Sequence, residues 1–355
     1  MAGSLFTIGI PTFNRAAFLP RAIECALGQS HREVEVIVSD NASTDQTEKI
    51  ARSYGSRVRY HRNDSNIGPW NNFARLADLA NGDSFSWLQD DCLIHRDFVS
   101  RAVIALNQAP EVHVYAAYLA AASGVGGDRQ TLFYPRVYGP PVGAAWMNGG
   151  GRLIEGRLVP LFSFFVNFAA PPALAFRTAA ARAGVSRLLL NCLIYNERIL
   201  LTHAADGGQI VVDPWIAGIY QLHPGQVSGS VTVEEWVSQW ETMTLSLGNH
   251  LQAQGDTRWR PLFAELLAEM SEADRRLLYD NPDKHTPPGL LWGAIHPVAG
   301  QIHRMLWDSL APEFRSQVER DHPTSGRARI KKSLARVGEA LTPPLIWRAI
   351  ERLRR

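Results

Sequence analysis

The first ninety residues alternate short apolar runs with amphipathic stretches. Two β-branched apolar runs, at 5–10 and 34–38, enclose a helical pattern from Ala17 to Leu27. Short runs of this kind are typical of buried strands, and apolar positions recurring every three to four residues indicate a helix. The chain therefore opens with a predicted strand, helix and strand.

The same alternation continues to residue 88. A helix is predicted at Ser43–Tyr54, because Ser, Thr and Asp favour helix starts and Gly55 follows its end. A strand at Arg57–His61, a helix at Trp70–Ala80 and a strand at Phe85–Leu88 come next. Strands that alternate with helices predict a mostly parallel sheet covered by helices on both faces, an α/β fold.

The remaining chain divides into segments of different character. The stretch Gly124–Gly156 is rich in Gly and Pro, which predicts loops with short strands. Beyond Val231 the patterns are helical, at Val233–Leu251, Arg258–Tyr279 and Gln301–Val318. We therefore expect an α/β part over 1–230, a helical region over 231–326 and a tail over 327–355.

The composition is that of a globular protein. Hydrophobic residues make up 46% and charged residues 20% of the chain, which argues against disorder or a fibrous repeat. Cys25, Cys92 and Cys192 lack metal-ligand spacing, so we expect free thiols in a reducing compartment. The pattern contains no signal peptide and no apolar stretch long enough to span a membrane, which predicts a cytoplasmic protein.

Charge is distributed unevenly. The formal net charge of +2 is too small to indicate a nucleic-acid partner. The tail 327–355 is basic and carries apolar residues at helical spacing. Such a segment fits peripheral contact with the inner face of an anionic membrane, and it equally fits a solvated helix packed on the protein body.

Polar clusters follow each of the four predicted strands. They occupy positions 11–15, 39–41, 63–68 and 90–91. In an open parallel sheet, ligands bind at the carboxyl ends of the strands, where loops and helix N-termini supply donors and side chains. The recurrence of these clusters predicts one shared site.

The acidic pair Asp90-Asp91 is the clearest candidate for chemistry. Adjacent carboxylates repel each other unless a cation, hydroxyl groups or solvent compensate, and Mg2+ or Mn2+ takes one or two carboxylates together with substrate phosphates. A solvated turn or a helix cap explains the pair equally well. Asp40 fits either a nucleobase contact or a turn-forming residue, whereas Asp45 is expected to help cap the helix after Ser43.

The series IGIPTFNRAAFLPRAIECALGQS, VEVIVSDNASTDQT, NIGPWNNF and SFSWLQDDC, over about residues 5–100, resembles the N-terminal half of family 2 glycosyltransferases. These are inverting enzymes of the GT-A fold. The resemblance implies a Rossmann-like catalytic domain with a C-terminal helical extension, in which 1–100 is the donor half and 101–230 the acceptor half. It also implies a nucleotide-diphosphate sugar donor and a Mn2+ or Mg2+ ion.

The resemblance assigns roles by position. Asp91 matches the metal ligand, and Gln89 is a departure, because many members carry another acid there. The donor-binding positions that the resemblance implies are Pro11, Thr12, Phe13, Arg15, Asp40, Asn41, Asn66, Gly68, Asn72 and Asp90.

The later chain matches the family less closely. Asn196–Leu200 resembles the family's acidic element before a helix, which implies Glu197 as the general base that takes the proton of the acceptor hydroxyl. An ordinary first-turn helix acid is the alternative, and Asp206 or Asp213 competes for the role. His223 resembles a residue of a later segment and implies a contact with the donor diphosphate or the metal, or else it is a simple turn histidine.

Together these features predict an inverting glycosyltransferase that moves a sugar to a hydroxyl acceptor in polysaccharide or glycoconjugate assembly. A UDP- or dTDP-sugar is the favoured donor, and a glycan or lipid-linked glycan is the expected acceptor. A sugar-nucleotide-binding protein without catalysis and a nucleotidyltransferase are the alternatives. A dinucleotide dehydrogenase is disfavoured, because no G-x-G-x-x-G follows the first strand.

Overall fold

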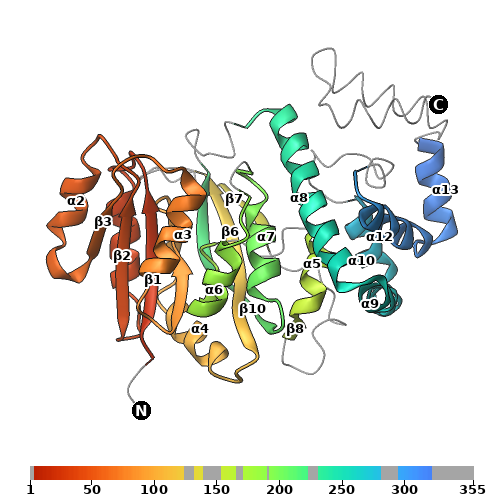
Figure 1. Ribbon diagram of the computed structural model, residues 1–355, viewed down its shortest axis with the longest axis horizontal. Coiled ribbons are helices and arrows are strands. Elements are labelled where there is room, and N and C mark those ends of the chain that lie inside the picture. Colours follow the sequence, from red (N-terminus) through yellow and green to blue (C-terminus); the bar gives the residue numbers. More distant parts are fainter. Residues whose placement is uncertain are drawn as a thin grey trace. The chain divides into compact units, whose positions relative to one another are not determined.

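The computed structural model separates into two compact units (Figure 1). The first comprises 1–140, 147–159 and 167–229, and the second comprises 141–146, 160–166 and 230–355. Within these, the structure describes residues 4–123, 132–138, 153–164, 171–189, 192–222, 231–280 and 295–321.

The first unit is built on one mixed sheet. Its described strands run in the order β3-β2-β1-β4-β9-β6-β10-β5, with β7 paired to β6 and β8 paired to β10. The strands are β1 (Phe6–Thr12), β2 (Val34–Asp40), β3 (Arg59–Arg62), β4 (Ser84–Trp87), β5 (Cys92–Ile94), β6 (Val112–Ser123), β7 (Leu132–Tyr138), β8 (Leu153–Glu155), β9 (Leu174–Arg177) and β10 (Gln209–Leu222).

The parallel order predicted for the first four strands is confirmed, but it does not extend over the whole sheet. β3, β2, β1 and β4 are parallel neighbours, because a helix or helical turn carries the chain back between them. β9 then pairs antiparallel with both β4 and β6, and β5, β7 and β8 are also antiparallel to their partners. The expectation of a mostly parallel sheet is therefore corrected to a mixed one.

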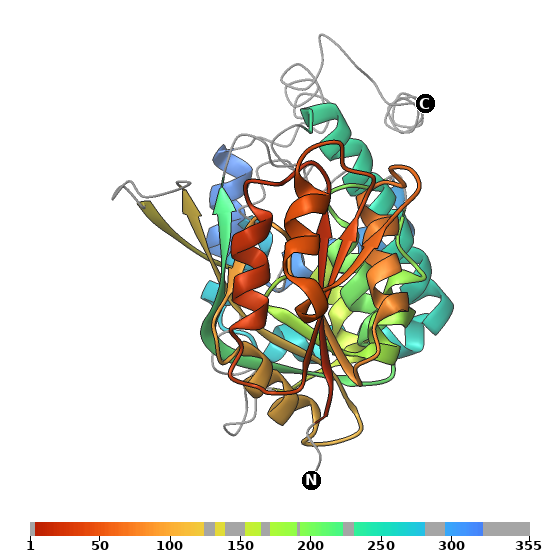
Figure 2. The same cartoon turned by 90° about the vertical axis from the view of Figure 1, so that its left-hand side faces the viewer.

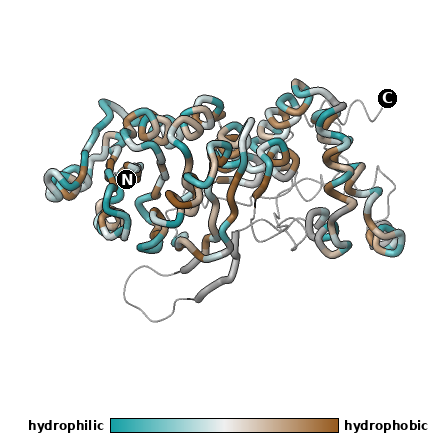
Figure 3. The backbone as a smooth tube through the Cα atoms, turned by 90° about the horizontal axis from the view of Figure 1, so that it is seen from below, coloured by the Kyte–Doolittle hydropathy of each residue, from teal (hydrophilic) through white to brown (hydrophobic). Residues whose placement is uncertain are grey.

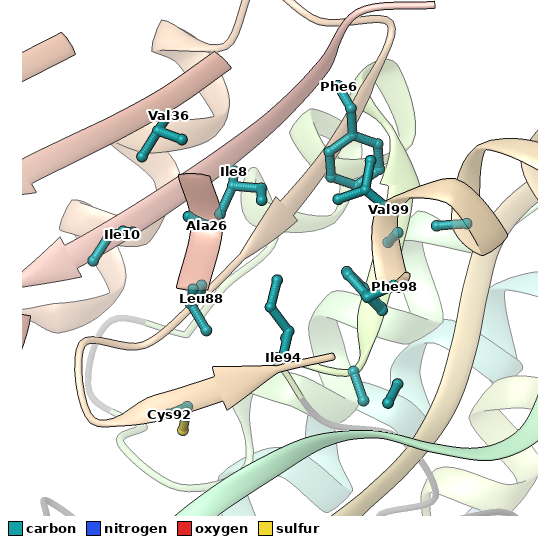
Figure 4. Packing of buried hydrophobic residues seen from close by; sticks show 14 of the residues in the cluster. Phe6, Ile8, Ile10, Ala26, Val36, Leu88, Cys92, Ile94, Phe98 and Val99 are labelled. Atoms are coloured by element: carbon teal, nitrogen blue, oxygen red, sulfur yellow. The ribbon is translucent and has the colours of Figure 1, made fainter. Parts of the chain in front are cut away.

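Helices cover both faces of the first strands (Figure 2). Ile8 belongs to a hydrophobic cluster shared with α1 and α4 (Figure 4), whereas a Cβ on its neighbour Gly9 would lie 3.1 Å from Leu76 of α3. Successive strand residues face opposite sides, so α1 and α3 pack on opposite faces. The helices of this unit are α1 (Leu19–Leu27), α2 (Thr47–Ser53), α3 (Pro69–Leu79), α4 (Phe98–Leu106), α6 (Thr178–Val185) and α7 (Asn196–Ala204). Of α5 (Val159–Ser163), only Val159 is assigned to this unit and the other residues to the second.

The second unit is helical, as the sequence predicts. Figure 3 shows hydrophobic and hydrophilic positions alternating along its helices, and Trp240, Trp259 and Phe263 are buried. Two of the three predicted helices are each divided in two. The helices are α8 (Val233–Gln254), α9 (Asp256–Glu269), α10 (Glu272–Asp280), α12 (Pro297–Asp308) and α13 (Pro312–Asp321).

No helix in the described parts of the chain is long and apolar enough to cross a membrane.

Candidate functional site

The loops that follow the first strands meet at one edge of the sheet. Thr12 and Asp40 are direct partners in the β1–β2 register. The backbone N–H of Asn41 donates to the Thr12 carbonyl at 2.9 Å, and that of Asn63 donates to the Asp40 carbonyl at 2.9 Å. The parallel strands therefore bring these predicted polar clusters together at their carboxyl ends.

The acidic turn between β4 and β5 joins this edge. Asp90 is 8% exposed. Burial and the neighbouring Asp91 raise the pKa of Asp90 to about 7, while nearby Thr12 and Arg15 oppose that rise. Two carboxylates, a hydroxyl and a guanidinium thus share one location, and the pair has the electrostatic character of a site that a cation stabilises.

The oxygen atoms around this turn fit a hard divalent ion. Gln89, the residue before the two acids in the chain, has a buried Oε1 without a hydrogen-bond partner. Within the described ranges, no group of three or more His, Cys, Asp and Glu side chains is assembled for a metal. Mg2+ and Mn2+ do not need such a group, because they complete their shell with water and phosphate oxygens. Asp90 and Asp91 are the residues that would hold the ion.

Asp40 is engaged on both carboxylate oxygens. Its side chain is fully buried. Oδ1 accepts a hydrogen bond from the Ser43 backbone N–H at 2.8 Å, and Oδ2 accepts from the Tyr60 hydroxyl at 2.6 Å and from Arg62 Nη1 at 2.9 Å. Of the two roles weighed for Asp40, these contacts favour the turn-forming one over a nucleobase contact.

Asn41 fixes the loop before α3. Its Nδ2 donates to Asn66 Oδ1 at 2.7 Å, and its Oδ1 accepts from the Ile67 backbone N–H at 2.9 Å. Gly68, with φ 82°, then lets the chain turn into the helix. These residues fix the conformation of this loop at the carboxyl ends of the strands through contacts within the protein.

Asn72 and Asn63 form the buried floor beneath that loop. Asn72 is 2% exposed, accepts from Ser39 Oγ at 2.7 Å and donates to the Ser39 carbonyl at 2.9 Å. Asn63 Nδ2 also donates to Asn72 Oδ1, at 3.0 Å. Asn72 is therefore a structural support for the site, with both its oxygen and its nitrogen already committed.

The loops after β1 and β2 are locked to each other. The Asn14 backbone N–H donates to Ser43 Oγ at 2.8 Å, and Asn14 Oδ1 accepts from the Thr44 backbone N–H at 2.7 Å. Asp45 accepts from the Ala16 backbone N–H at 3.0 Å and from the Thr47 backbone N–H at 3.0 Å. Asp45 therefore serves the start of α2, as expected, and also ties down the loop after β1.

Of the predicted donor residues near that first loop, Phe13 lies on its outer part, whereas Pro11 belongs to strand β1. Phe13 is 41% exposed, an unusual position for a large apolar side chain, and Pro11 is partly exposed. Arg15 lies over the Phe18 ring, 5.5 Å from its centroid. This loop thus presents an aromatic surface and a positive charge next to the acidic turn.

Glu197 occupies the first turn of α7. Asn196, fully buried, donates to the carbonyls of Leu189 and Cys192 at 2.8 and 2.7 Å and so fixes the start of the helix. Glu197 Oε2 is buried without a hydrogen-bond partner, and burial raises the pKa of this side chain to about 7. In the part of the chain that is described, no hydrogen bond links Glu197 to the loops at the sheet edge.

The acids that compete with Glu197 have other surroundings. Asp213 accepts two hydrogen bonds from Arg101, at 2.7 and 2.9 Å, and another from the Tyr115 hydroxyl at 3.0 Å. Asp206 is exposed in the turn after α7. Glu197 combines a raised pKa with a buried carboxylate oxygen that has no hydrogen-bond partner. His223 lies outside the described residues, as does the tail 327–355.

Gln221, at the end of β10, is a contributor that the sequence analysis did not single out. With its amide in the orientation that satisfies both neighbours, its nitrogen donates to the Asp91 carbonyl at 3.1 Å and its oxygen accepts from Arg21 Nη1 at 3.2 Å. The residue is 7% exposed. A glutamine at a strand end carries no sequence signal for this role, because the contact joins segments far apart in the chain.

The unit is an α/β domain with polar loops and an acidic turn at the carboxyl ends of its strands, which is where open α/β sheets generally bind ligands. Residues 7–170 match the family model described as glycosyl transferase family 2. Through this segment, which is less than half of the chain, the protein is similar to glycosyl transferase family 2.

Similar proteins include named glycosyltransferases. The chain is 37% identical over 97 residues to abequosyltransferase RfbV of Salmonella typhimurium, covering 25% of this chain and 29% of that protein. It is 34% identical over 116 residues to a PGL/p-HBAD biosynthesis glycosyltransferase of Mycobacterium bovis, covering 30% and 44% of the two chains. The chain thus spans less than half the length of each of these curated relatives.

A solved structure with a similar fold covers more of the chain. The crystal structure of Staphylococcus aureus TarS 1–349 in complex with UDP-GlcNAc matches with a TM-score of 0.53 at 14% identity, over 88% of this chain and 92% of that one. At this identity the likeness concerns the fold alone, and it confirms the GT-A-like architecture.

Proposed function

We propose that the chain is a metal-assisted, inverting glycosyltransferase that moves a sugar from a nucleotide diphosphate to a hydroxyl group. The observation that carries the proposal is the Asp90-Asp91 turn, set beside Thr12 and Arg15 at the carboxyl edge of a domain similar to family 2. Carboxylates and a guanidinium at one location suit a phosphate-bearing ligand held with a divalent ion.

The donor half of the site is assigned as follows. Asp91 is the direct metal ligand, and Asp90 supports it from a buried position. A bound Mn2+ or Mg2+ would stabilise the negative charge of the departing diphosphate. Arg15 contributes a second positive charge, and the loop around Pro11 and Phe13 lies along the nucleotide. Asn41, Asn66, Gly68 and Asn72 support the donor half by fixing the loop before α3 to the end of β2.

Glu197 is assigned as the general base. Inversion requires the acceptor hydroxyl to lose its proton as it attacks the anomeric carbon on the face opposite the leaving diphosphate. A carboxylate with a pKa of about 7 accepts a proton readily at neutral pH and returns it easily. The hydrogen bonds of Asn196 keep the first turn of α7, and therefore Glu197, in place.

We propose a UDP- or dTDP-sugar as donor and a glycan or lipid-linked glycan as acceptor. The named relatives in Salmonella and Mycobacterium, an abequosyltransferase and a PGL/p-HBAD biosynthesis glycosyltransferase, support the transfer of a sugar. His223 is proposed as a further contact of the donor diphosphate.

We also propose that the basic tail 327–355 holds the protein at an anionic membrane surface. Its Lys and Arg residues and Trp347 have the composition of interfacial helices. Co-sedimentation of the full chain with phosphatidylglycerol vesicles, but not with phosphatidylcholine vesicles, is the expected result. Equal recovery with both vesicle types would refute membrane contact driven by charge.

The reaction is tested by incubating the protein with Mn2+ and a panel of UDP-, dTDP- and GDP-sugars. Water replaces the acceptor in this assay, so slow release of the nucleoside diphosphate is expected from one donor. NMR of the sugar anomer formed first, before mutarotation, reports inversion. Asp91→Asn should abolish release, while Asp78→Asn, at an exposed acid of α3, should leave it unchanged.

Two results would contradict the proposal. Release of pyrophosphate from a nucleoside triphosphate would identify a nucleotidyltransferase. Metal-dependent binding of a nucleotide sugar without turnover, in the presence of glycan acceptors, would identify a binding protein.

A further inference from the structure

Three side chains converge beneath the loop after β2. Asp40 ends β2, and Tyr60 and Arg62 lie on the neighbouring strand β3. Both side chains donate to the same carboxylate oxygen of Asp40, at 2.6 and 2.9 Å, while the other oxygen accepts from the Ser43 backbone N–H at 2.8 Å. The carboxylate thus joins two strands to the loop that follows one of them.

Arg62 reaches the same loop directly. Its Nη2 donates to the Ser43 carbonyl at 2.9 Å, so the N–H of Ser43 is held by Asp40 and its C=O by Arg62. Glu48 of α2 lies 3.7 Å from Arg62, and the Arg52 guanidinium covers the Tyr60 ring at 4.7 Å. The start of α2 is therefore tied to the same cluster.

The fixed loop borders the candidate site. Residues 43–45 hold the loop after β1 through Asn14 and Ala16, and that loop leads to Thr12 and Arg15 beside the acidic turn. If the turn at Ser43 became more mobile, the residues that we place along the nucleotide would therefore be less well positioned. A loop fixed before the ligand arrives lowers the entropy cost of binding.

We propose that Asp40, Tyr60 and Arg62 form a latch that sets the loop 41–45 in its ligand-binding conformation. Asp40 is then a positioning residue that does not contact the nucleobase, because its carboxylate is buried and occupied by three donors within the protein. This inference rests on the proposed function for its effect on nucleotide binding. The latch itself is a property of the folded chain.

A latch and a carboxylate that contacts the base affect nucleotide specificity differently. A base-reading carboxylate discriminates among nucleobases, so its loss changes the ranking of nucleotides. A latch acts on the loop as a whole, so its loss weakens all nucleotides by a similar factor. The ratio of affinities for UDP, dTDP and GDP therefore separates the two roles.

The test uses Tyr60→Phe, Arg62→Gln and Asp40→Asn, with Arg59→Gln as the control. Arg59 is the first residue of β3, at the opposite end of the strand from the loop 41–45. It forms an ion pair with Glu35 at 3.1 Å. Hydrogen exchange of the peptide covering 41–46 is measured without nucleotide, and calorimetry with Mn2+ follows for the three nucleotides. The melting temperature of each variant verifies that it is folded.

The latch predicts faster exchange of 41–46 in Tyr60→Phe and Arg62→Gln, and unchanged exchange in Arg59→Gln. Nucleotide affinity should fall about tenfold in each latch variant, the typical worth of one hydrogen bond to a charged group, with the same ranking as in the native protein. The variant that carries both Tyr60→Phe and Arg62→Gln should bind nucleotide only slightly more weakly than either single variant, because the three residues act as a unit.

Two outcomes would overturn the inference. Unchanged exchange of 41–46 in both latch variants would show that these contacts do not hold the loop. A changed nucleotide ranking in Asp40→Asn, with Tyr60→Phe unaffected, would show that Asp40 contacts the base. If the native protein binds no nucleotide, the proposed function fails, and the exchange measurement still decides whether the latch exists.

Discussion

Replacing Glu197 by Gln should make the protein more stable at alkaline pH while removing its activity. Burial raises the pKa of Glu197 from 4.5 to about 7, so the ionised form is disfavoured in the folded state. At about 1.4 kcal/mol for each pKa unit, the cost is at most about 3.5 kcal/mol, an upper value because the side chain is only half-buried.

The sign of the pH dependence follows from linkage. Below pH 4.5 the carboxyl group is protonated in both folded and unfolded chains, so it contributes no penalty. As the pH rises from 4.5 through about 7, the unfolded chain ionises first, and the folded state loses stability until the penalty is complete. The neutral Gln side chain avoids this loss.

The assay compares melting temperatures of the native protein and Glu197→Gln between pH 4.5 and 8.5. The increase in melting temperature caused by Glu197→Gln should be near zero at pH 4.5. At pH values above 7 it should reach several degrees. Glu111→Gln, at an exposed acid, is the matched control and should show no such trend. A gain that does not change with pH would refute the raised pKa of Glu197.

Activity provides the second half of this prediction. For the native protein, kcat/KM for donor turnover should decline below about pH 7, because protonated Glu197 cannot accept the acceptor's proton. Glu197→Gln should lose about a hundredfold to ten-thousandfold in kcat. Retention of most activity in this variant would transfer the base role to another group.

Three further substitutions test the support of the site. Asn72→Ala removes the buried hydrogen bonds to Ser39 and should cost about 2 kcal/mol in urea unfolding; an unchanged midpoint would contradict the floor assigned to Asn72. Gln221→Glu keeps an acceptor for Arg21 but cannot donate to the Asp91 carbonyl, so the affinity for Mn2+ should fall about tenfold, and native affinity would argue against the contact. Gly9→Ala places a methyl group 3.0 Å from the Phe85 ring and should destabilise by about 1–3 kcal/mol; a native melting temperature would show that the ring can yield.

Local pattern was sufficient to predict the first half of the fold. The apolar runs of β1, β2 and β4 and the helical spacing of α1 and α3 are continuous in sequence, so periodicity identifies them. The antiparallel insertion of β9 between β4 and β6 was not predictable in this way. Which strands become neighbours depends on contacts between segments far apart in the chain.

The same distinction applies to the site. The Asp90-Asp91 pair follows a buried strand, and from this position the sequence offered a metal site and a solvated turn or helix cap as alternatives. The occupation of Asp40 was beyond prediction, because Tyr60 and Arg62 belong to another strand and reach it only in the folded sheet. The contact of Gln221 with Asp91 was hidden for the same reason.

The most direct test of the proposed donor site is calorimetry of UDP, dTDP and GDP with and without Mn2+, on the native protein and on Asp91→Asn and Asp78→Asn. We expect one nucleotide to bind only with Mn2+, Asp91→Asn to lose that binding and Asp78→Asn to retain it. If no nucleotide binds the folded native protein, or if binding is the same without the metal and in Asp91→Asn, a metal-assisted donor site at the acidic turn is refuted.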